Sequence, residues 1–170
     1  MSFGTLGINK DDFDKIFQQW YEPVRNYVYY KSGDIDLSED IAQDAFLKIW
    51  EKRETIIMQT AQNLLFKIAG NLFINRMNHN KIRYNFISEY KGNGTSESAD
   101  FELEMKEFDS KLQDTLASLD DKKRTVFLMN RIDEMSYVEI AAALGITVKA
   151  VEKRMGKTLE ILRKKIDRNI

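Results

Sequence analysis

The amino-acid sequence predicts an all-α protein made of two small helical domains that are joined by a flexible linker. Apolar residues recur at intervals of three and four along most of the chain, which is the period of amphipathic helices. One proline and eight glycines in 170 residues are few for a turn-rich β protein. Residues 90–98, YKGNGTSES, interrupt the helical pattern with small and polar residues and predict the linker.

From this pattern we expect a first domain at residues 8–88, a flexible acidic linker at residues 89–107 and a second domain at residues 108–170. Neither domain exceeds about 80 residues, so each core is small and only moderately stable by itself. No internal repeat is visible in either part of the chain.

The first helix is predicted from an apolar stripe that runs from Phe13 to Val28. Asn9 is a suitable N-cap for it, because its side chain can accept a hydrogen bond from the first turn. Pro23 lies inside the stripe and is expected to bend or interrupt the helix. Gly33 is expected to end it.

The second helix is expected to begin at Asp36, since Glu39 follows three residues later in a pattern close to a capping box. Its apolar stripe runs from Ile41 to Trp50. The opposite face is mostly acidic, with one apolar residue among its members. That face carries Asp40, Gln43, Asp44, Leu47 and Glu51.

The third helix is expected after an irregular stretch at residues 52–61, with an apolar stripe from Leu64 to Met77. Lys67, Asn71 and Asn75 follow one another at intervals of four on its other side. Asparagine is a poor interior helix former, so this row suggests a role beyond solubility, although a merely polar helix has the same pattern. Amide and basic groups can bind base edges and phosphates.

The last 60 residues predict three or four short helices, two of which form a helix-turn-helix. Ser136 with Glu139 predicts a capped helix, Gly145 predicts the turn, and Thr147 predicts the cap of the final helix. The final helix has a buried stripe that begins at Val148 and an outward row of charged residues. A basic second helix in this arrangement is typical of DNA binding in the major groove, whereas the alternative is an ordinary helical hairpin with a solvated face.

Charge is unevenly distributed although the net charge is only −1. Residues 122–168 carry twelve Lys or Arg against six Asp or Glu, whereas residues 97–109 carry six acids and one lysine. Residues 34–54 carry seven acids and three bases. This pattern suggests nucleic acid as one partner and a basic surface as another, and solvated helix faces remain the alternative.

Composition argues against several classes of protein. The chain has no cysteine and a single histidine, His79, so disulfides and thiolate or His-rich metal sites are not expected. No apolar run approaches the length of about 18 residues that spans a bilayer. Residues 1–7 lack the pattern of a secretion signal. We therefore expect a cytoplasmic protein without a cofactor or resident metal, and no cluster of residues predicts a catalytic site.

Four segments of the sequence resemble the sigma-70 family of RNA polymerase subunits. Residues 40–50, DIAQDAFLKIW, and residues 64–77, LLFKIAGNLFINRM, resemble successive segments of region 2. Residues 136–154 resemble the helix-turn-helix of region 4, and residues 116–126 resemble the helix before it. A region 2 followed by a region 4, without a region 1 or region 3 domain, is similar to the layout of the extracytoplasmic-function (ECF) group.

The chain departs from the family pattern at four positions. Leu64 stands where tryptophan is frequent, Asp120 where proline is usual, and Ala150 near a frequent threonine. Gly156 interrupts the recognition helix where a larger polar residue is common. These departures bear on the promoter sequence rather than on the family.

The resemblance implies a sigma factor that directs core RNA polymerase to promoters, with an anti-sigma factor as a further partner and no membrane insertion. For polymerase binding it implies Asp40, Gln43, Asp44, Leu47 and Glu51. For the melted −10 element it implies Met58, Gln59, Thr60, Lys67, Asn71, Asn75, Arg76, Asn80, Lys81 and Arg83. For the duplex −35 element it implies Arg124, Ser136, Tyr137, Thr147, Lys149, Glu152, Lys153, Arg154 and Lys157.

Two other functions are compatible with parts of the pattern. One is a helix-turn-helix regulator that binds an operator without polymerase, for which a dimerisation helix is expected and none is visible. The other is an enzyme that acts on nucleic acid through a metal bound by Asp40 and Asp44, which lie one helical turn apart. No further acid or histidine converges on these two carboxylates in the sequence.

Overall fold

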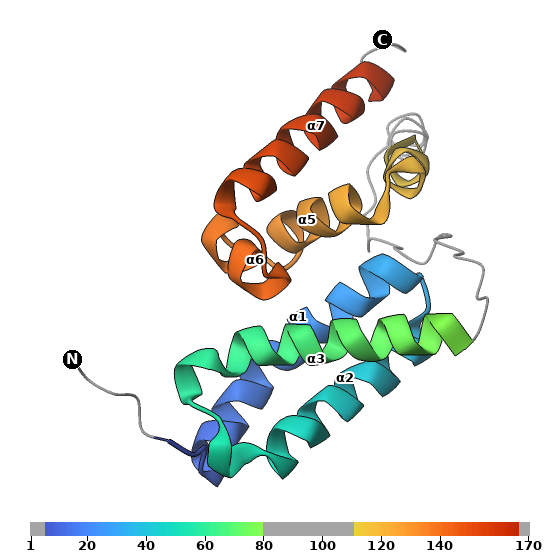
Figure 1. Cartoon of the computed structure of the whole chain (residues 1–170). Coiled ribbons are helices and arrows are strands. Elements are labelled where there is room, and N and C mark those ends of the chain that lie inside the picture. Colours follow the sequence, from blue (N-terminus) through green and yellow to red (C-terminus); the bar gives the residue numbers. More distant parts are fainter. Residues whose placement is uncertain (1–5, 80–110, 167–170) are drawn as a thin grey trace, which may run out of the picture.

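The computed structural model of the chain describes residues 6–79 and 111–166. These residues are almost entirely helical, and their one extended pairing is an isolated bridge between Leu6 and Ile57. The all-α prediction is therefore confirmed, while the predicted linker at 89–107 lies outside the described residues. The elements, shown in Figure 1, are α1 (Lys10–Ser32), α2 (Ile35–Glu51), the 3-10 turn η1 (Arg53–Thr55), α3 (Met58–His79), α5 (Asp121–Arg131), α6 (Tyr137–Leu144) and α7 (Val148–Ile166). Residues 111–118 are helical as well.

The first bundle consists of α1, α2 and α3, each of which packs against the other two. Apolar side chains from all three helices are fully buried between them, and this burial supplies the main stabilisation of the bundle. Pro23 does not interrupt α1, which continues to Ser32. The buried Val24 and Val28 follow the proline and hold the rest of the helix against the core. The largest buried side chains here are Val24, Val28, Ile41, Ile49, Leu65 and Phe66.

Local hydrogen bonds explain where α1 begins and ends. The Asn9 side chain accepts from the Asp12 amide at 2.8 Å, which confirms the predicted N-cap. Gly33 adopts a left-handed conformation with φ 66°, and its amide donates to the Tyr29 carbonyl at 2.8 Å. A glycine at this position avoids the steric penalty that an L side chain would have.

Two predicted helix starts are wrong by a few residues. The cap of α2 is Asp34 rather than Asp36, because the Asp34 carboxylate accepts from the Leu37 amide at 2.9 Å. The turn at Gly33 already reverses the chain, so the helix can start at once. Helix α3 begins at Met58, which lies inside the stretch predicted to be irregular. No favourable capping residue precedes Met58, so the sequence gives no local sign of this start.

The second bundle consists of α5, α6 and α7, packed around buried side chains that include Val126, Met129 and Val151. Ser136 and Glu139 form the predicted capping box, and Gly145 has φ 64° in the turn between α6 and α7. The Thr147 hydroxyl accepts from the Ala150 amide at 3.2 Å and so caps α7 as predicted. The helix-turn-helix is therefore confirmed as a structure.

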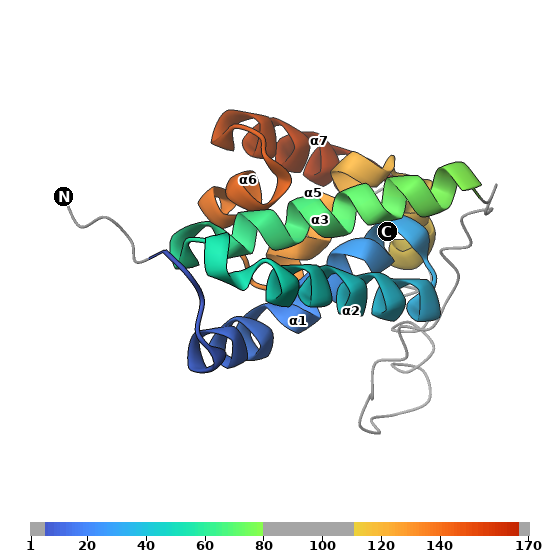
Figure 2. The same cartoon turned by 60° about the horizontal axis from the view of Figure 1, so that its bottom comes forward.

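The two bundles contact one another through α1 with α5 and through α3 with α6 (Figure 1, Figure 2). Arg124 of α5 is buried in this contact, where its Nε donates to the Tyr30 carbonyl of α1 at 2.9 Å. Its Nη1 donates to the Leu119 carbonyl at 3.0 Å. A buried guanidinium is tolerated only when its donors are satisfied, so these bonds make Arg124 a structural link between the bundles.

A second polar link joins Asn26 of α1 to Asp133, which follows α5. The Asn26 amide nitrogen donates to the Asp133 carboxylate at 2.7 Å. Burial raises the pKa of the Asp133 carboxyl to about 6, and hydrogen bonds from Asn26 and Tyr30 oppose that rise. Of the neighbouring charges, Glu22 raises this pKa further and Arg25 lowers it. The carboxylate is thus harder to keep ionised in the folded chain than in water.

The raised pKa predicts that Asp133 makes the folded chain less stable as the pH rises. A group whose pKa is higher in the folded state stabilises it below its unfolded pKa, near 3.8, and loses that contribution as the pH rises through about 6. Asp133→Asn keeps the oxygen that accepts from Asn26 and removes the titration. We expect this variant to be more stable than the parent at pH 7.5, with a smaller difference at pH 5. Thermal unfolding of both proteins at the two pH values measures this, and an equal difference at both would contradict it.

Candidate functional site

The acidic face predicted on α2 is present in the structure. Asp40, Gln43, Leu47 and Glu51 are exposed, and the side chain of Asp44 is 46% exposed. Leu47 is 55% exposed, which places an apolar side chain among the acids. An exposed leucine surrounded by carboxylates is a surface suited to a basic protein partner that also offers an apolar contact.

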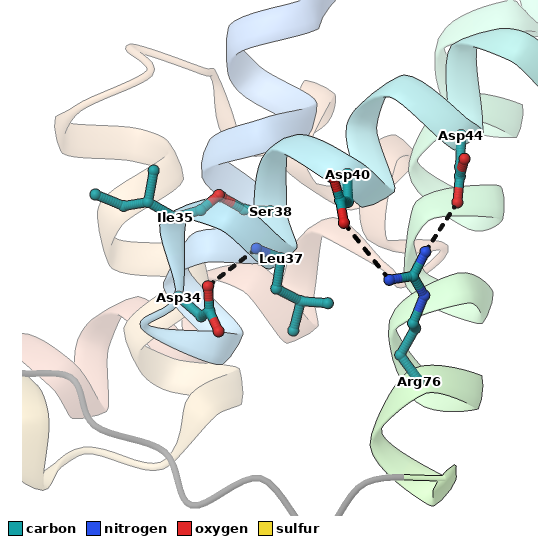
Figure 3. Close-up of polar contacts among 7 residues, drawn as sticks. All are labelled: Asp34, Ile35, Leu37, Ser38, Asp40, Asp44 and Arg76. Carbon is teal, nitrogen blue, oxygen red and sulfur yellow. Dashed lines mark hydrogen bonds and ion pairs between the residues drawn. The ribbon is translucent and has the colours of Figure 1, made fainter.

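Arg76 of α3 lies between two of these carboxylates (Figure 3). Its Nη2 is 3.2 Å from the Asp44 carboxylate, and its Nη1 is 3.7 Å from the Asp40 carboxylate. A residue expected to contact −10 DNA is therefore paired with two residues expected to contact polymerase. The three side chains are 42–65% exposed, and ion pairs this open to solvent are weak enough for a partner to replace.

Lys67, Asn71 and Asn75 are all exposed on α3, as their spacing predicts. Met58, Gln59 and Thr60 are also exposed, and they form the first turn of α3 rather than a loop. The connection before them, residues 52–57, includes η1, the buried Ile56 and the exposed Ile57. Three further residues expected at the −10 element lie outside the described residues: Asn80, Lys81 and Arg83.

The recognition helix α7 divides into a buried and an exposed side. Val151, Met155 and Leu162 are buried, and Thr158 is fully buried as well, with its hydroxyl donating to the Arg154 carbonyl at 2.9 Å. The sequence pattern had not placed this threonine in the core. The charged residues predicted on the outward side are exposed, apart from the half-buried Arg154. The exposed members are Lys149, Glu152, Lys153 and Lys157.

Gly156 lies on the exposed side of α7, and a Cβ built there has no atom within 4 Å. Glycine is a poor helix former, so Gly156→Ala should raise the free energy of unfolding by about 0.5–1 kcal/mol. Urea unfolding of the two proteins measures this. A decrease in stability would show that the position does not behave as an ordinary exposed helical site.

Arg124 and Tyr137 differ from the rest of the predicted −35 set. Arg124 is 6% exposed and bonded to main-chain carbonyls, so it is not accessible to DNA while the two bundles are in contact. Tyr137 is half-buried at the start of α6. Ser136 and Thr147 are exposed, although both side chains also cap helices.

Comparison with known families bears on both bundles. The family model described as Sigma-70 region 2 matches residues 16–82, and the model described as Sigma-70, region 4 matches residues 109–162. The two regions follow in the family's order and together cover most of the chain. The chain belongs to the sigma-70 family. As a sigma factor it binds RNA polymerase and directs initiation of transcription at promoters.

Individual relatives agree with this assignment and with the ECF group. The sigma factor is 29% identical to the ECF RNA polymerase sigma factor SigW of Bacillus subtilis, over 93% of this chain and 90% of SigW. It is similar in fold to RpoE of Bartonella quintana, which was solved with the anti-sigma factor NepR. The two are 17% identical, with a TM-score of 0.66 over 94% of this chain and 99% of the RpoE chain. It is also similar in fold to CnrH, which was solved with the cytosolic domain of CnrY. The two are 23% identical, with a TM-score of 0.63 over 95% of this chain and 92% of the CnrH chain.

Two features of this sigma factor have no local signal in its sequence. The pairing of Arg76 with Asp40 and Asp44 depends on how α3 crosses α2, more than 30 residues apart in the chain. The link between Asn26 and Asp133 joins residues separated by 107 positions. Neither pair forms a helical spacing or a known motif, so only the folded structure brings its members together.

Proposed function

We propose that the sigma factor divides its work among three surfaces. The acidic face of α2 docks on a basic surface of core RNA polymerase, the exposed side of α3 and the connection before it hold the melted −10 strand, and α7 reads the −35 element as duplex. The single observation that best supports this division is the exposed acidic face of α2 around Leu47, since it is separate from the basic face of α7. A neutral chain with segregated charges suits two partners of opposite sign.

We propose further that the sigma factor has no catalytic activity of its own. A nucleic-acid enzyme would need a third ligand near Asp40 and Asp44, and among residues 6–79 and 111–166 no group of three His, Cys, Asp or Glu is placed to hold a metal ion. Arg76 occupies the space between the two carboxylates instead. The sigma factor would act on promoter DNA in the cytoplasm, at the nucleoid. None of the described helices is long and apolar enough to cross a membrane.

Promoter binding requires the two bundles to separate. Elements centred near −10 and −35 are about 25 base pairs apart, or about 85 Å along B-form DNA. In the structure α3, the helix proposed to carry the −10 surface, contacts α6 of the helix-turn-helix. Opening would also release Arg124 from Tyr30 and make its guanidinium available to a phosphate.

We propose an anti-sigma factor as a partner that favours the closed arrangement. RpoE of Bartonella quintana was solved in complex with the anti-sigma factor NepR, and CnrH was solved in complex with the cytosolic domain of CnrY. A protein that binds both bundles at once would prevent opening by its differential affinity for the closed state. Co-purification from cells under non-inducing conditions would identify it.

Run-off transcription with purified core polymerase across a promoter library tests the function as a whole. We expect specific start sites that require the sigma factor. Binding of a defined operator without polymerase, and no run-off with it, would instead support the helix-turn-helix regulator.

Asn71→Ala with Asn75→Ala tests the −10 surface. These amides are exposed one turn apart on α3 and can hydrogen-bond unpaired bases, so we expect about a tenfold loss of open complexes, measured by permanganate reactivity. A premelted −10 element should restore part of the loss. Unchanged melting of duplex promoters would remove this role from α3.

A further inference from the structure

The segment before α1 runs antiparallel to the connection between α2 and α3. Leu6 pairs with Ile57 in an antiparallel bridge. The Gly7 amide donates to the Ile56 carbonyl at 3.1 Å, and the Ile8 amide donates to the Arg53 carbonyl at 2.8 Å. Two successive backbone donors are therefore bonded to the connection on which the −10 role depends.

Side-chain burial fixes the same contact. Ile8 is 3% exposed and Ile56 is 5% exposed, so each contributes to the core of the first bundle at the two sides of the pairing. Gly7, which precedes Ile8, has φ 99°, a conformation that L side chains rarely adopt. A Cβ at this position would lie 3.6 Å from the Glu54 carbonyl, which is an ordinary contact. The backbone conformation, rather than lack of space, therefore requires glycine at position 7.

Arg53 anchors the connection from the other end. Its guanidinium lies over the Trp50 ring at 4.4 Å from the centroid, and its Nη1 donates to the Trp50 carbonyl at 3.0 Å. The Arg53 carbonyl accepts from the Ile8 amide, and the Arg53 side chain is bonded to Trp50 at the end of α2. Residues 53–57 are held by α2 at one end and by the N-terminal segment along their length.

The exposed side of this pairing is apolar. Leu6 is 68% exposed, and Ile57 and Met58 are each 37% exposed. Unstacked bases pack on apolar and aromatic side chains, and the contact is stronger when the surface is held in shape before binding. Leu6 extends the surface that Ile57 and Met58 present at the start of α3.

We infer that Gly7 and Ile8 are positioning residues for the −10 connection, and that Leu6 contributes to the surface that receives an unstacked −10 base. This inference rests on the proposed function of α3 and the connection before it. It adds a segment that lies outside the family-matched residues 16–82. Promoter melting and −10 base preference should then depend on residues 6–8, while core polymerase binding should not.

Gly7→Ala is the main test, with holoenzyme assembled from the full chain. We expect about a tenfold loss of open complexes on duplex promoters and relaxed base preference within the −10 element, because an L residue disfavours the φ at position 7. Core affinity should stay within about twofold of the parent. Ile8→Val should behave like the parent and Ile8→Ala should resemble Gly7→Ala, since the isoleucine acts through burial.

Leu6→Ala keeps the test valid if Gly7→Ala does not fold, because it leaves the backbone unchanged. It should alter −10 base preference with an unchanged melting temperature of the protein. Parallel loss of core polymerase binding and of promoter melting in every variant would overturn the inference, since that result indicates a purely structural role. Unchanged promoter melting together with unchanged −10 base preference would overturn it as well. If the parent holoenzyme itself shows no −10-dependent melting, the proposed function fails first.

Discussion

Reversing the charge of both Asp40 and Asp44 should reduce binding to core RNA polymerase by about 100-fold or more, since loss of close interfacial charge pairs costs about 2–5 kcal/mol. Both carboxylates lie on the exposed face of α2, one helical turn apart, and the exposed Leu47 follows Asp44 within the next turn. Lysine at both positions would meet the basic partner surface with like charge and would also repel Arg76. The measurement is the affinity of fluorescently labelled sigma factor for core enzyme.

A matched control separates docking from net charge. Asp14→Lys with Asp114→Lys makes the same change in net charge at two exposed acids on other elements. This control should retain core affinity within about threefold at physiological salt, because screening limits the effect of distant charges. The helical content of both double variants should match the parent by circular dichroism. Equal affinity of Asp40→Lys/Asp44→Lys and the parent would remove the docking role from α2.

Arg76 would give the proposed docking face a further property. In the free chain its guanidinium pairs with both carboxylates, so a basic polymerase surface that docked on this face would displace it. Displacement would free a cation on α3, the same helix that carries Lys67 and Asn71. Polymerase binding and −10 binding would then be coupled through one side chain, by a free energy no larger than that of exposed ion pairs, about 0–1 kcal/mol each.

The sequence predicted most accurately those features that depend on a few neighbouring residues. The caps at Asn9, Ser136 and Thr147 and the turn at Gly145 were predicted and are confirmed, because a side chain bonds to an amide only three residues away or a glycine adopts a positive φ. The predicted start of α2 is wrong because two favourable capping residues lie close together in the sequence. Asp34 and Asp36 are both favourable caps, and only the turn at Gly33 decides between them.

Features that depend on packing between distant segments were not predictable in this way. The resemblance implies Arg124 as a −35 contact, and nothing in the sequence shows that its guanidinium donates to main-chain carbonyls at the contact with α1. The pairing of residues 6–8 with residues 53–57 was equally invisible, because an isolated bridge has no periodicity. Periodicity shows which side of a helix is buried, but it does not show which helix covers it.

The exposed residues of α7 do not depend on packing between distant segments, because the spacing of residues along this one helix determines which side chains face outward. Thr147 caps the end of α7 that enters the groove in helix-turn-helix proteins, and Lys149 and Lys153 lie nearest to that end. Lys157 lies a further turn away and is expected to contact phosphate. Contacts to base edges specify sequence, whereas contacts to phosphate supply affinity that does not depend on sequence.

Lys149→Ala should therefore cost about 1–3 kcal/mol of promoter affinity and relax the preference at one −35 position. Lys157→Ala should weaken all promoters alike and lower the slope of affinity against salt by about one unit, because one phosphate contact releases about one counterion. Selection of −35 sequences with the two holoenzymes at two salt concentrations distinguishes these effects. If Lys157→Ala changes the base preference and Lys149→Ala does not, α7 enters the groove by its other end.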